Sequence, residues 1–232
     1  MTHSYDDFFE ALGKKESHGD YKSINTLRFM GKYQMGELSL IDLGYYTPDG
    51  HSGDNRYSDK FWTGKEGIKS KTDFLNSPQI QEKAVREYAK HNWLSILNFG
   101  LDRYIGRNIH EVPITISGLL AGAHNQGPRR VSTFIKYGVN SKDGYGTEIK
   151  SYIKDLSGYD TPFKSRKKLL GLKKDKQGQT VMYQIEGKDW ISVADAIQMV
   201  KAFLLDAVIV TNSKGTVFLK TPPDHSTDNN LG

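Results

Sequence analysis

The stretch KKESHGDYKSINTLRFMGKYQMGE, residues 14–37, decides how this chain is interpreted. It follows residues 5–15, where large apolar side chains recur at helical spacing and predict a helix. Gly19-Asp20 then predicts a turn. Glu16 therefore lies at a helix end. It is either an ordinary solvated charge, the common case for a glutamate, or a proton donor in the wall of a cleft.

Composition sets the broad class of protein. The chain has 232 residues, 37% hydrophobic and 25% charged, which is typical of a globular protein. The absence of cysteine excludes disulfides, thiolate metal sites and a cysteine nucleophile. No apolar run reaches the roughly 20 residues of a membrane span, and the first residues do not resemble a secretory signal.

Periodicity predicts a mostly helical first part of the chain and a different second part. We expect an α+β protein with a helical body at 1–160, a basic linker at 161–178, and a strand–helix–strand–strand module at 179–232. The predicted helices after the first are 39–46, 78–97, 113–123, 130–137, 148–156 and 192–205. The predicted strands are 180–185, 206–211 and 216–220, with a hairpin turn at 212–215.

Three sequence blocks resemble the lytic transglycosylase and goose-type lysozyme superfamily. The blocks are ESHGDY…GKYQMGE, AGAHNQGPRRV and GYGTEIKSYI, beside the family's approximate ESxF…GxxGLMQ, AYNAGPxRV and PYxETxxYV. Glu16 and Gln34 are 18 residues apart, and Glu148 and Tyr152 are 4 apart, as in the family. Each block alone is a weak signal, and AHNQGP taken alone reads as an ordinary helix end. Their order over about 140 residues carries the resemblance.

The resemblance implies a mainly α-helical lysozyme-like catalytic domain with Glu16 as the catalytic acid. It implies a substrate groove lined by the matching residues Ser17, Tyr33, Gln34, His124, Asn125, Glu148 and Tyr152. His124 stands where the family has tyrosine. Cleavage of a glycosidic bond needs a protonated acid, and a free glutamate is ionised at neutral pH. We therefore expect burial to raise the pKa of Glu16.

The second catalytic group is open. Residues 25–30 contain no acidic side chain, so the hairpin aspartate of goose-type lysozymes is missing. Glu37 follows Gln34 by three residues and is the best second carboxylate, but it equally fits a charge at a helix N-terminus. Asp20 and Asp42 are weaker candidates, and Asp49 and Asp54 lie in a predicted surface loop. The resemblance implies two outcomes. In goose-type lysozymes additional aspartates position an attacking water, whereas in the transglycosylases the single glutamate activates the muramic acid 6-hydroxyl and a 1,6-anhydro product forms.

Other chemistries have less support. No His-x-x-x-His pair is present, and the G-x-G at 144–146 lacks the rest of a nucleotide fingerprint, so we expect no metal and no cofactor. The net charge of +5 is concentrated in residues 164–176, without the interleaved aromatic residues of single-strand binders, so we expect no nucleic-acid partner. A non-catalytic glycan-binding module of the same fold stays as an alternative.

The end of the chain shows a second resemblance. WISVADAIQMV and the segment from residue 208 to the end resemble a small domain of unknown function, which implies no chemistry of its own. The expected substrate is peptidoglycan, cleaved at the MurNAc-GlcNAc β-1,4 bond in the periplasm or outside the cell. Without a visible signal peptide, we expect delivery as a phage-type lysin or as an antibacterial effector. An effector would use a secretion machine, and its producer would need an immunity protein.

Overall fold

The computed structural model describes residues 3–51 and 53–222. The chain is an α+β protein made of two compact units, residues 1–163 and 164–232. Each unit has its own cluster of buried apolar side chains. No helix in the described part of the chain is both long enough and apolar enough to cross a membrane.

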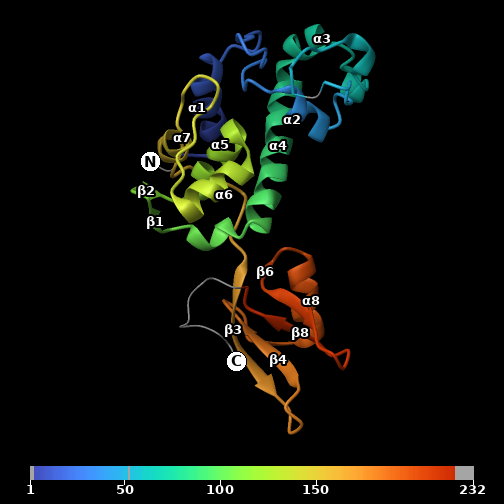
Figure 1. The fold of residues 1–232 in the computed structure, drawn as a ribbon, viewed down its shortest axis with the longest axis vertical. Helices are drawn as coiled ribbons and strands as arrows, with labels where there is room; N and C mark the ends of the chain where they lie inside the picture. The colour runs from blue at the N-terminus through green and yellow to red at the C-terminus, as the bar shows by residue number, and fades with distance from the viewer. Residues whose placement is uncertain (1–2, 52, 223–232) are drawn as a thin grey trace. The chain divides into compact units, whose positions relative to one another are not determined.

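The first unit is mainly helical, with α5 and α6 packed against the long helix α4 (Figure 1). Its helices are α1 (Tyr5–Ser17), α2 (Glu37–Asp42), α3 (Lys71–Leu75), α4 (Pro78–Asn98), α5 (Ile116–Gln126), α6 (Pro128–Tyr137) and α7 (Ile149–Asp155). Short 3₁₀ turns are η1 (Asp59–Phe61), η2 (Lys65–Gly67) and η3 (Leu101–Tyr104), and the two-residue strands β1 (Asn108–Ile109) and β2 (Val112–Pro113) pair antiparallel.

Local capping explains where several helices begin. Ser4 and Asp7 form a reciprocal capping box at the start of α1. Helix α5 starts three residues later than the predicted 113–123, because the Thr115 side chain accepts the Gly118 N–H and Pro113 is paired in β2. Helix α3 was not predicted from the sequence.

Two glycines let α5 and α7 pack closely. A Cβ added at Gly118 would lie 2.5 Å from the Ile153 carbonyl oxygen, and one at Gly122 would lie 2.8 Å from the Ile153 side chain. These spaces leave no room for a methyl group. The close approach fixes α7, and with it Tyr152, against the helix that carries His124 and Asn125.

The second unit begins earlier than expected. Residues 161–178 were predicted as a basic linker, but residues 167–174 form a strand, so that prediction is wrong there. Leu169 is buried and Leu172 packs against the same apolar cluster, while the flanking lysines keep their charges toward water. The strand was not predicted because lysines make up half of its residues.

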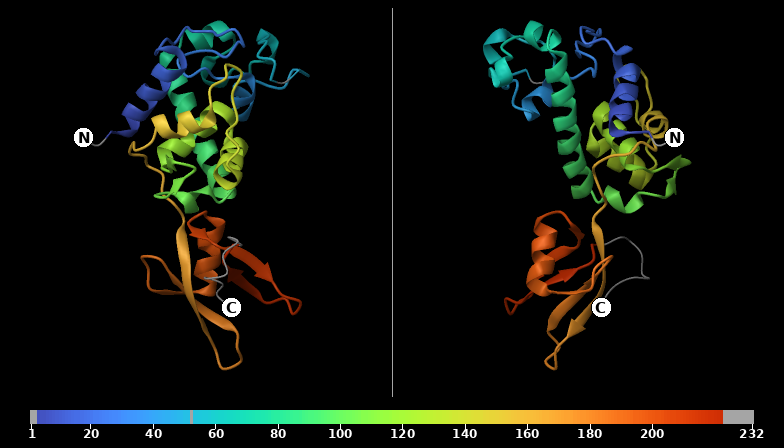
Figure 2. Two further views of the ribbon diagram at one scale, coloured as in Figure 1. Left: turned by 60° about the vertical axis from the view of Figure 1, so that its left-hand side comes forward. Right: turned by 180° about the vertical axis from the view of Figure 1, so that it is seen from behind.

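A four-stranded sheet, a hairpin and one helix make up the second unit. The elements are β3 (Lys167–Lys174), β4 (Thr180–Ile185), β5 (Trp190–Ser192), α8 (Val193–Lys201), β6 (Leu205–Asp206), β7 (Val208–Thr211) and β8 (Val217–Lys220). The sheet order is β5-β4-β3-β6, antiparallel except for β3 with β6, and β7 pairs with β8. Helix α8, capped by Ser192 as expected, contacts both the sheet and the hairpin (Figure 2). Residues 223–232 of the predicted module lie outside the described residues.

Candidate functional site

Glu16 and Ser17 occupy the last turn of α1. The helix ends because His18 adopts a left-handed conformation with φ 58°. The buried Ser17 hydroxyl donates to the Lys32 carbonyl oxygen at 2.8 Å, which ties this helix end to the following loop. Ser17 therefore positions the end of α1.

The Glu16 carboxyl group is nearly buried, with 12% of its side chain exposed. The Tyr152 hydroxyl donates to Glu16 Oε1 at 3.0 Å. Burial raises the pKa of Glu16 to about 7; the Tyr152 hydrogen bond opposes this rise, and the charge of Asp143 adds to it. The group is therefore substantially protonated near neutral pH.

His124 faces the same carboxyl group but carries no charge at neutral pH. Its Nε2 lies 3.8 Å from Glu16 Oε1 and 2.8 Å from the Tyr33 carbonyl oxygen. Burial lowers the pKa of His124 to about 4, so the ring is neutral and Nε2–H donates to Tyr33. A neutral ring supplies no cation that would ionise Glu16.

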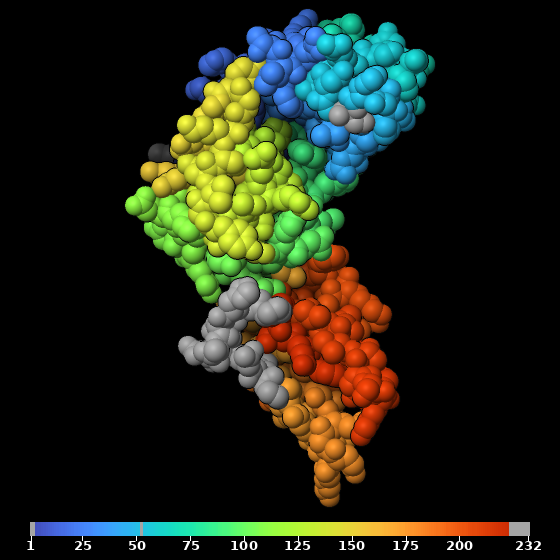
Figure 3. Space-filling view, viewed as in Figure 1, coloured from blue at the N-terminus to red at the C-terminus, as the bar shows by residue number. Residues whose placement is uncertain are grey.

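Glu16 opens into a cavity of about 300 Å³. The lining combines a carboxyl pair, amides, basic groups, a phenol and apolar side chains. These residues are Glu16, Leu27, Phe29, Gln34, His124, Asn125, Gln126, Arg130, Lys142, Asp143, Gly144 and Tyr145. The segment near residue 145 and the segment near residue 27 meet at one face of the unit, where the Tyr145 hydroxyl lies 2.7 Å from Thr26 Oγ1 (Figure 3).

Asp143 is the second carboxylate of the cavity, and sequence reasoning missed it. Its Oδ2 accepts from Asn125 Nδ2 at 3.0 Å, and its Oδ1 accepts the N–H groups of Tyr145 and Thr147. Burial acts to raise the pKa of Asp143, but these hydrogen bonds outweigh burial and hold the pKa below its ordinary value. Asp143 is therefore an anion near a protonated Glu16. The turn sequence of residues 143–146 was its sole local signal.

Of three other residues expected in the groove, Gln34 and Asn125 line the cavity and Tyr33 lies in the core. Gln34 lines the cavity with φ 45°, and its Nε2 donates to the Gly31 carbonyl. Asn125 also lines it and interacts with the Tyr152 hydroxyl. The Tyr33 ring is buried in the core instead, with its hydroxyl donating to Glu82 at 2.7 Å, so only its carbonyl reaches His124.

Glu37 and Glu148 lie outside the set of described residues that line the cavity. Glu37 is inaccessible to solvent, and its Oε2 accepts from the Asn55 N–H at 3.2 Å. Glu148 precedes α7, is half exposed, and lies 3.9 Å from the Lys142 ammonium group. The structure thus joins Glu16, Gln34, His124, Asn125 and Tyr152 at one site but not these two carboxylates.

Comparison with known proteins identifies only the end of the chain. A family model described as "Protein of unknown function (DUF3892)" matches residues 168–232, beginning within β3. No curated protein and no solved structure matches the chain. The helical unit that holds the cavity therefore has to be interpreted from its own geometry.

Proposed function

We propose that this chain cleaves the glycan strands of peptidoglycan, with Glu16 as general acid in a lysozyme-like unit. The observation that carries the proposal is the burial of Glu16, which holds its proton near neutral pH at a cavity wall. A glycosidic oxygen leaves only when it is protonated, so an acid with a pKa near 7 suits this reaction.

Tyr152 and Asp143 would assist the two parts of the reaction, the protonation of the leaving oxygen and the stabilisation of the anomeric carbon. Tyr152 donates to Glu16 Oε1, which leaves Oε2 to carry the acidic proton toward the leaving oxygen. The anionic Asp143 faces the same cavity and can stabilise positive charge at the anomeric carbon or orient a water molecule. In this scheme Asp143 takes the part that the sequence had suggested for Glu37.

Peptidoglycan as substrate rests on the three sequence blocks together with a cavity rich in amide and basic groups. The same blocks support an activity outside the cytoplasm, as a phage-type lysin or a secreted antibacterial effector. An effector of this kind would be opposed in its producer by an immunity protein that fills the cavity.

Transglycosylation is a second candidate, favoured by one observation. Of the two carboxyl groups among the described lining residues, only Glu16 has a raised pKa. A single such group can act first as acid and then as base toward the substrate's 6-hydroxyl. A purely binding module fits less well, because a nearly buried carboxyl group lowers stability near neutral pH without serving attachment.

Digestion of purified sacculi tests the proposal. The full chain, Glu16→Gln and the control Glu111→Gln are compared by mass spectrometry of the released fragments. Glu111 is a suitable control because it lies between β1 and β2, its exposed side chain pairs with Lys150, and it is not among the described residues that line the cavity. We expect fragments from the wild type and the control, and at least a 10²-fold loss in Glu16→Gln. Reducing ends indicate hydrolysis and anhydro ends indicate transglycosylation; intact sacculi with all three proteins would refute cleavage.

A further inference from the structure

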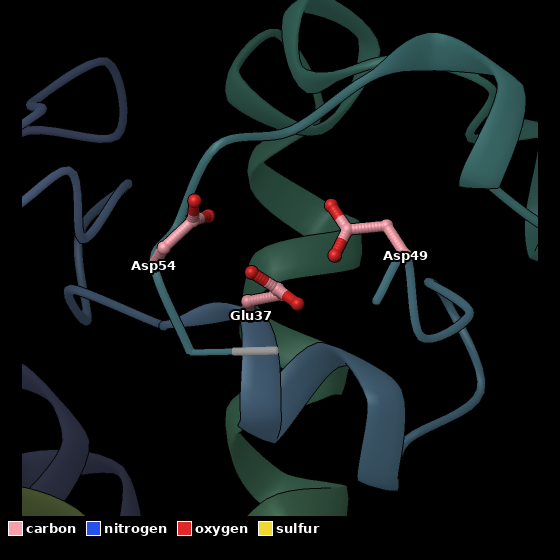
Figure 4. Close-up of side chains that lie close together, drawn as sticks. All are labelled: Glu37, Asp49 and Asp54. Carbon is pink, nitrogen blue, oxygen red and sulfur yellow. The ribbon is translucent and has the colours of Figure 1, made fainter. Parts of the chain in front are cut away.

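Three carboxylates converge beside α2. Glu37 begins that helix, and Asp49 and Asp54 flank the tip of the loop that follows it (Figure 4). One oxygen from each residue lies within 4.8 Å of the other two. Figure 4 shows the Glu37 carboxyl group between the two aspartates, with all three groups directed toward a common space.

The Glu37 side chain supplies an independent sign of a missing ligand. Glu37 is 0% exposed, and its Oε1 has no hydrogen-bond partner in the described structure. A backbone hydrogen bond from Gly53 acts to lower the pKa of the Glu37 carboxyl group, while Oε1 itself has no partner among the described residues. A buried acceptor without a partner is costly, and here it points at two more carboxylates.

We propose that Glu37, Asp49 and Asp54 form a divalent cation site suited to Ca²⁺. Oxygen ligands on opposite sides of Ca²⁺ lie about 4.6–5.2 Å apart, whereas those of Mg²⁺ lie about 4.0–4.2 Å apart. The observed spread of up to 4.8 Å lies within the range for Ca²⁺ and exceeds that for Mg²⁺. The site departs from the sequence-based expectation of no metal, because its ligands come from a helix start and a loop rather than from a spaced motif.

Nearby groups leave the cluster strongly negative. Asp54 lies 3.6 Å from the Arg56 Nε, but the Arg56 side chain is 70% exposed and pairs with no other carboxylate among the described residues. Asp49 accepts the His51 N–H at 2.9 Å and lies 3.4 Å from the Tyr46 hydroxyl. One exposed arginine cannot offset three carboxylates, whereas a divalent ion at this position would offset their charge and give Glu37 Oε1 a partner.

The site is linked to the cavity wall through Asn55. Glu37 and Asn55 exchange two hydrogen bonds, since the Glu37 N–H donates to Asn55 Oδ1 at 2.8 Å and the Asn55 N–H donates to Glu37 Oε2. Asn55 Nδ2 then donates to the carbonyl oxygen of Leu27, which lines the cavity. A bound ion would thus hold Asp49 and Asp54 together with Glu37 and, through Asn55, the Leu27 segment. Glu37 and Asn55 are positioning residues.

Thermal unfolding of the full chain tests the site. Wild type, Asp49→Asn, Asp54→Asn and the control Asp59→Asn are compared in EDTA, in 10 mM CaCl₂, and in NaCl of equal ionic strength. Asp59 is an exposed aspartate of η1 that is not part of the cluster. With a dissociation constant of about 10⁻⁴–10⁻³ M, Ca²⁺ should raise the wild-type Tm by about 3–10 °C.

The variants should show a pattern that an ordinary acidic patch would not. In EDTA, Asp49→Asn and Asp54→Asn should melt at or above the wild-type temperature, because each removes one of three repelling charges. In CaCl₂ they should lose most of the Tm rise, while Asp59→Asn keeps it. An equal rise in NaCl, a rise that persists in both cluster variants, or no binding heat on titrating Ca²⁺ into wild type would overturn the proposal.

Discussion

Replacing Glu16 with Gln should stabilise the helical unit at alkaline pH, and the size follows from the burial of the carboxyl group. The folded pKa is about 7 and the ordinary value is 4.5. Between these values the folded state binds more protons than the unfolded state, so stability falls as pH rises through this window. The ionised carboxylate then costs about 0.8 kcal/mol at pH 5 and about 3.3 kcal/mol at pH 8, a difference of about 2.5 kcal/mol.

The measurement is a double difference. Urea unfolding of wild type and Glu16→Gln at pH 5 and pH 8 gives four free energies of unfolding. Comparing the variants across pH cancels any pH-independent effect of the substitution, such as an altered hydrogen bond with Tyr152. Because Trp62 and Trp93 belong to the helical unit and Trp190 to the other, a Trp190→Phe background makes fluorescence report the helical unit alone.

We expect Glu16→Gln to gain about 2.5 kcal/mol relative to wild type between pH 5 and pH 8. The control Glu111→Gln should give a small change of opposite sign, because the exposed Lys150 pair lowers the pKa of Glu111. A double difference below about 0.5 kcal/mol would mean that Glu16 is ionised in the folded protein at neutral pH. That result would remove the basis for a general acid at this position.

Two further predictions follow from named contacts. Tyr152→Phe removes a hydrogen bond that favours ionised Glu16, so the alkaline limb of the pH profile of glycan cleavage should move up by about one pH unit. Asp143→Asn removes a negative charge that raises the pKa of Glu16, so the same limb should move down. Limbs that move in the same direction would contradict these assignments. Gly118→Ala places a methyl group 2.5 Å from the Ile153 carbonyl oxygen, so urea unfolding should show a loss of about 1–3 kcal/mol, and an unchanged midpoint would show that α7 can move away.

The elements that sequence predicted well are those with local causes. Residues 5–15 form most of α1, and both their apolar spacing and the turn after residue 17 are determined by residues close together in the sequence. The strand at 167–174 was missed because lysines dominate its composition, and only tertiary packing shows that Leu169 is buried. Helix α8 and its cap were found for the same reason as α1.

The residues of the candidate site show the same difference between local sequence signals and tertiary packing. Glu16, Asn125 and Tyr152 were found because motif spacing preserves their places on helices. Asp143 was missed because it acquires its partners through a loop that folds back on α5. Glu37 was expected beside Gln34 because the two are three residues apart. Gly36 caps α2, and Glu37, the first residue of that helix, has its carboxyl group directed toward Asp49 and Asp54.

Glu16 and Glu37 show why a raised pKa alone does not identify a catalytic acid. Burial is the leading cause of the rise in both, and neighbouring aspartate charges add to it in both. They differ in access: Glu16 lines a cavity and has 12% of its side chain exposed, whereas Glu37 has no exposed surface and faces two carboxylates. A group that exchanges protons with a substrate must touch it, and a group that cannot be reached can contribute only by holding structure. On this ground we propose Glu16, rather than Glu37, as the group that transfers the proton, and a positioning role for Glu37.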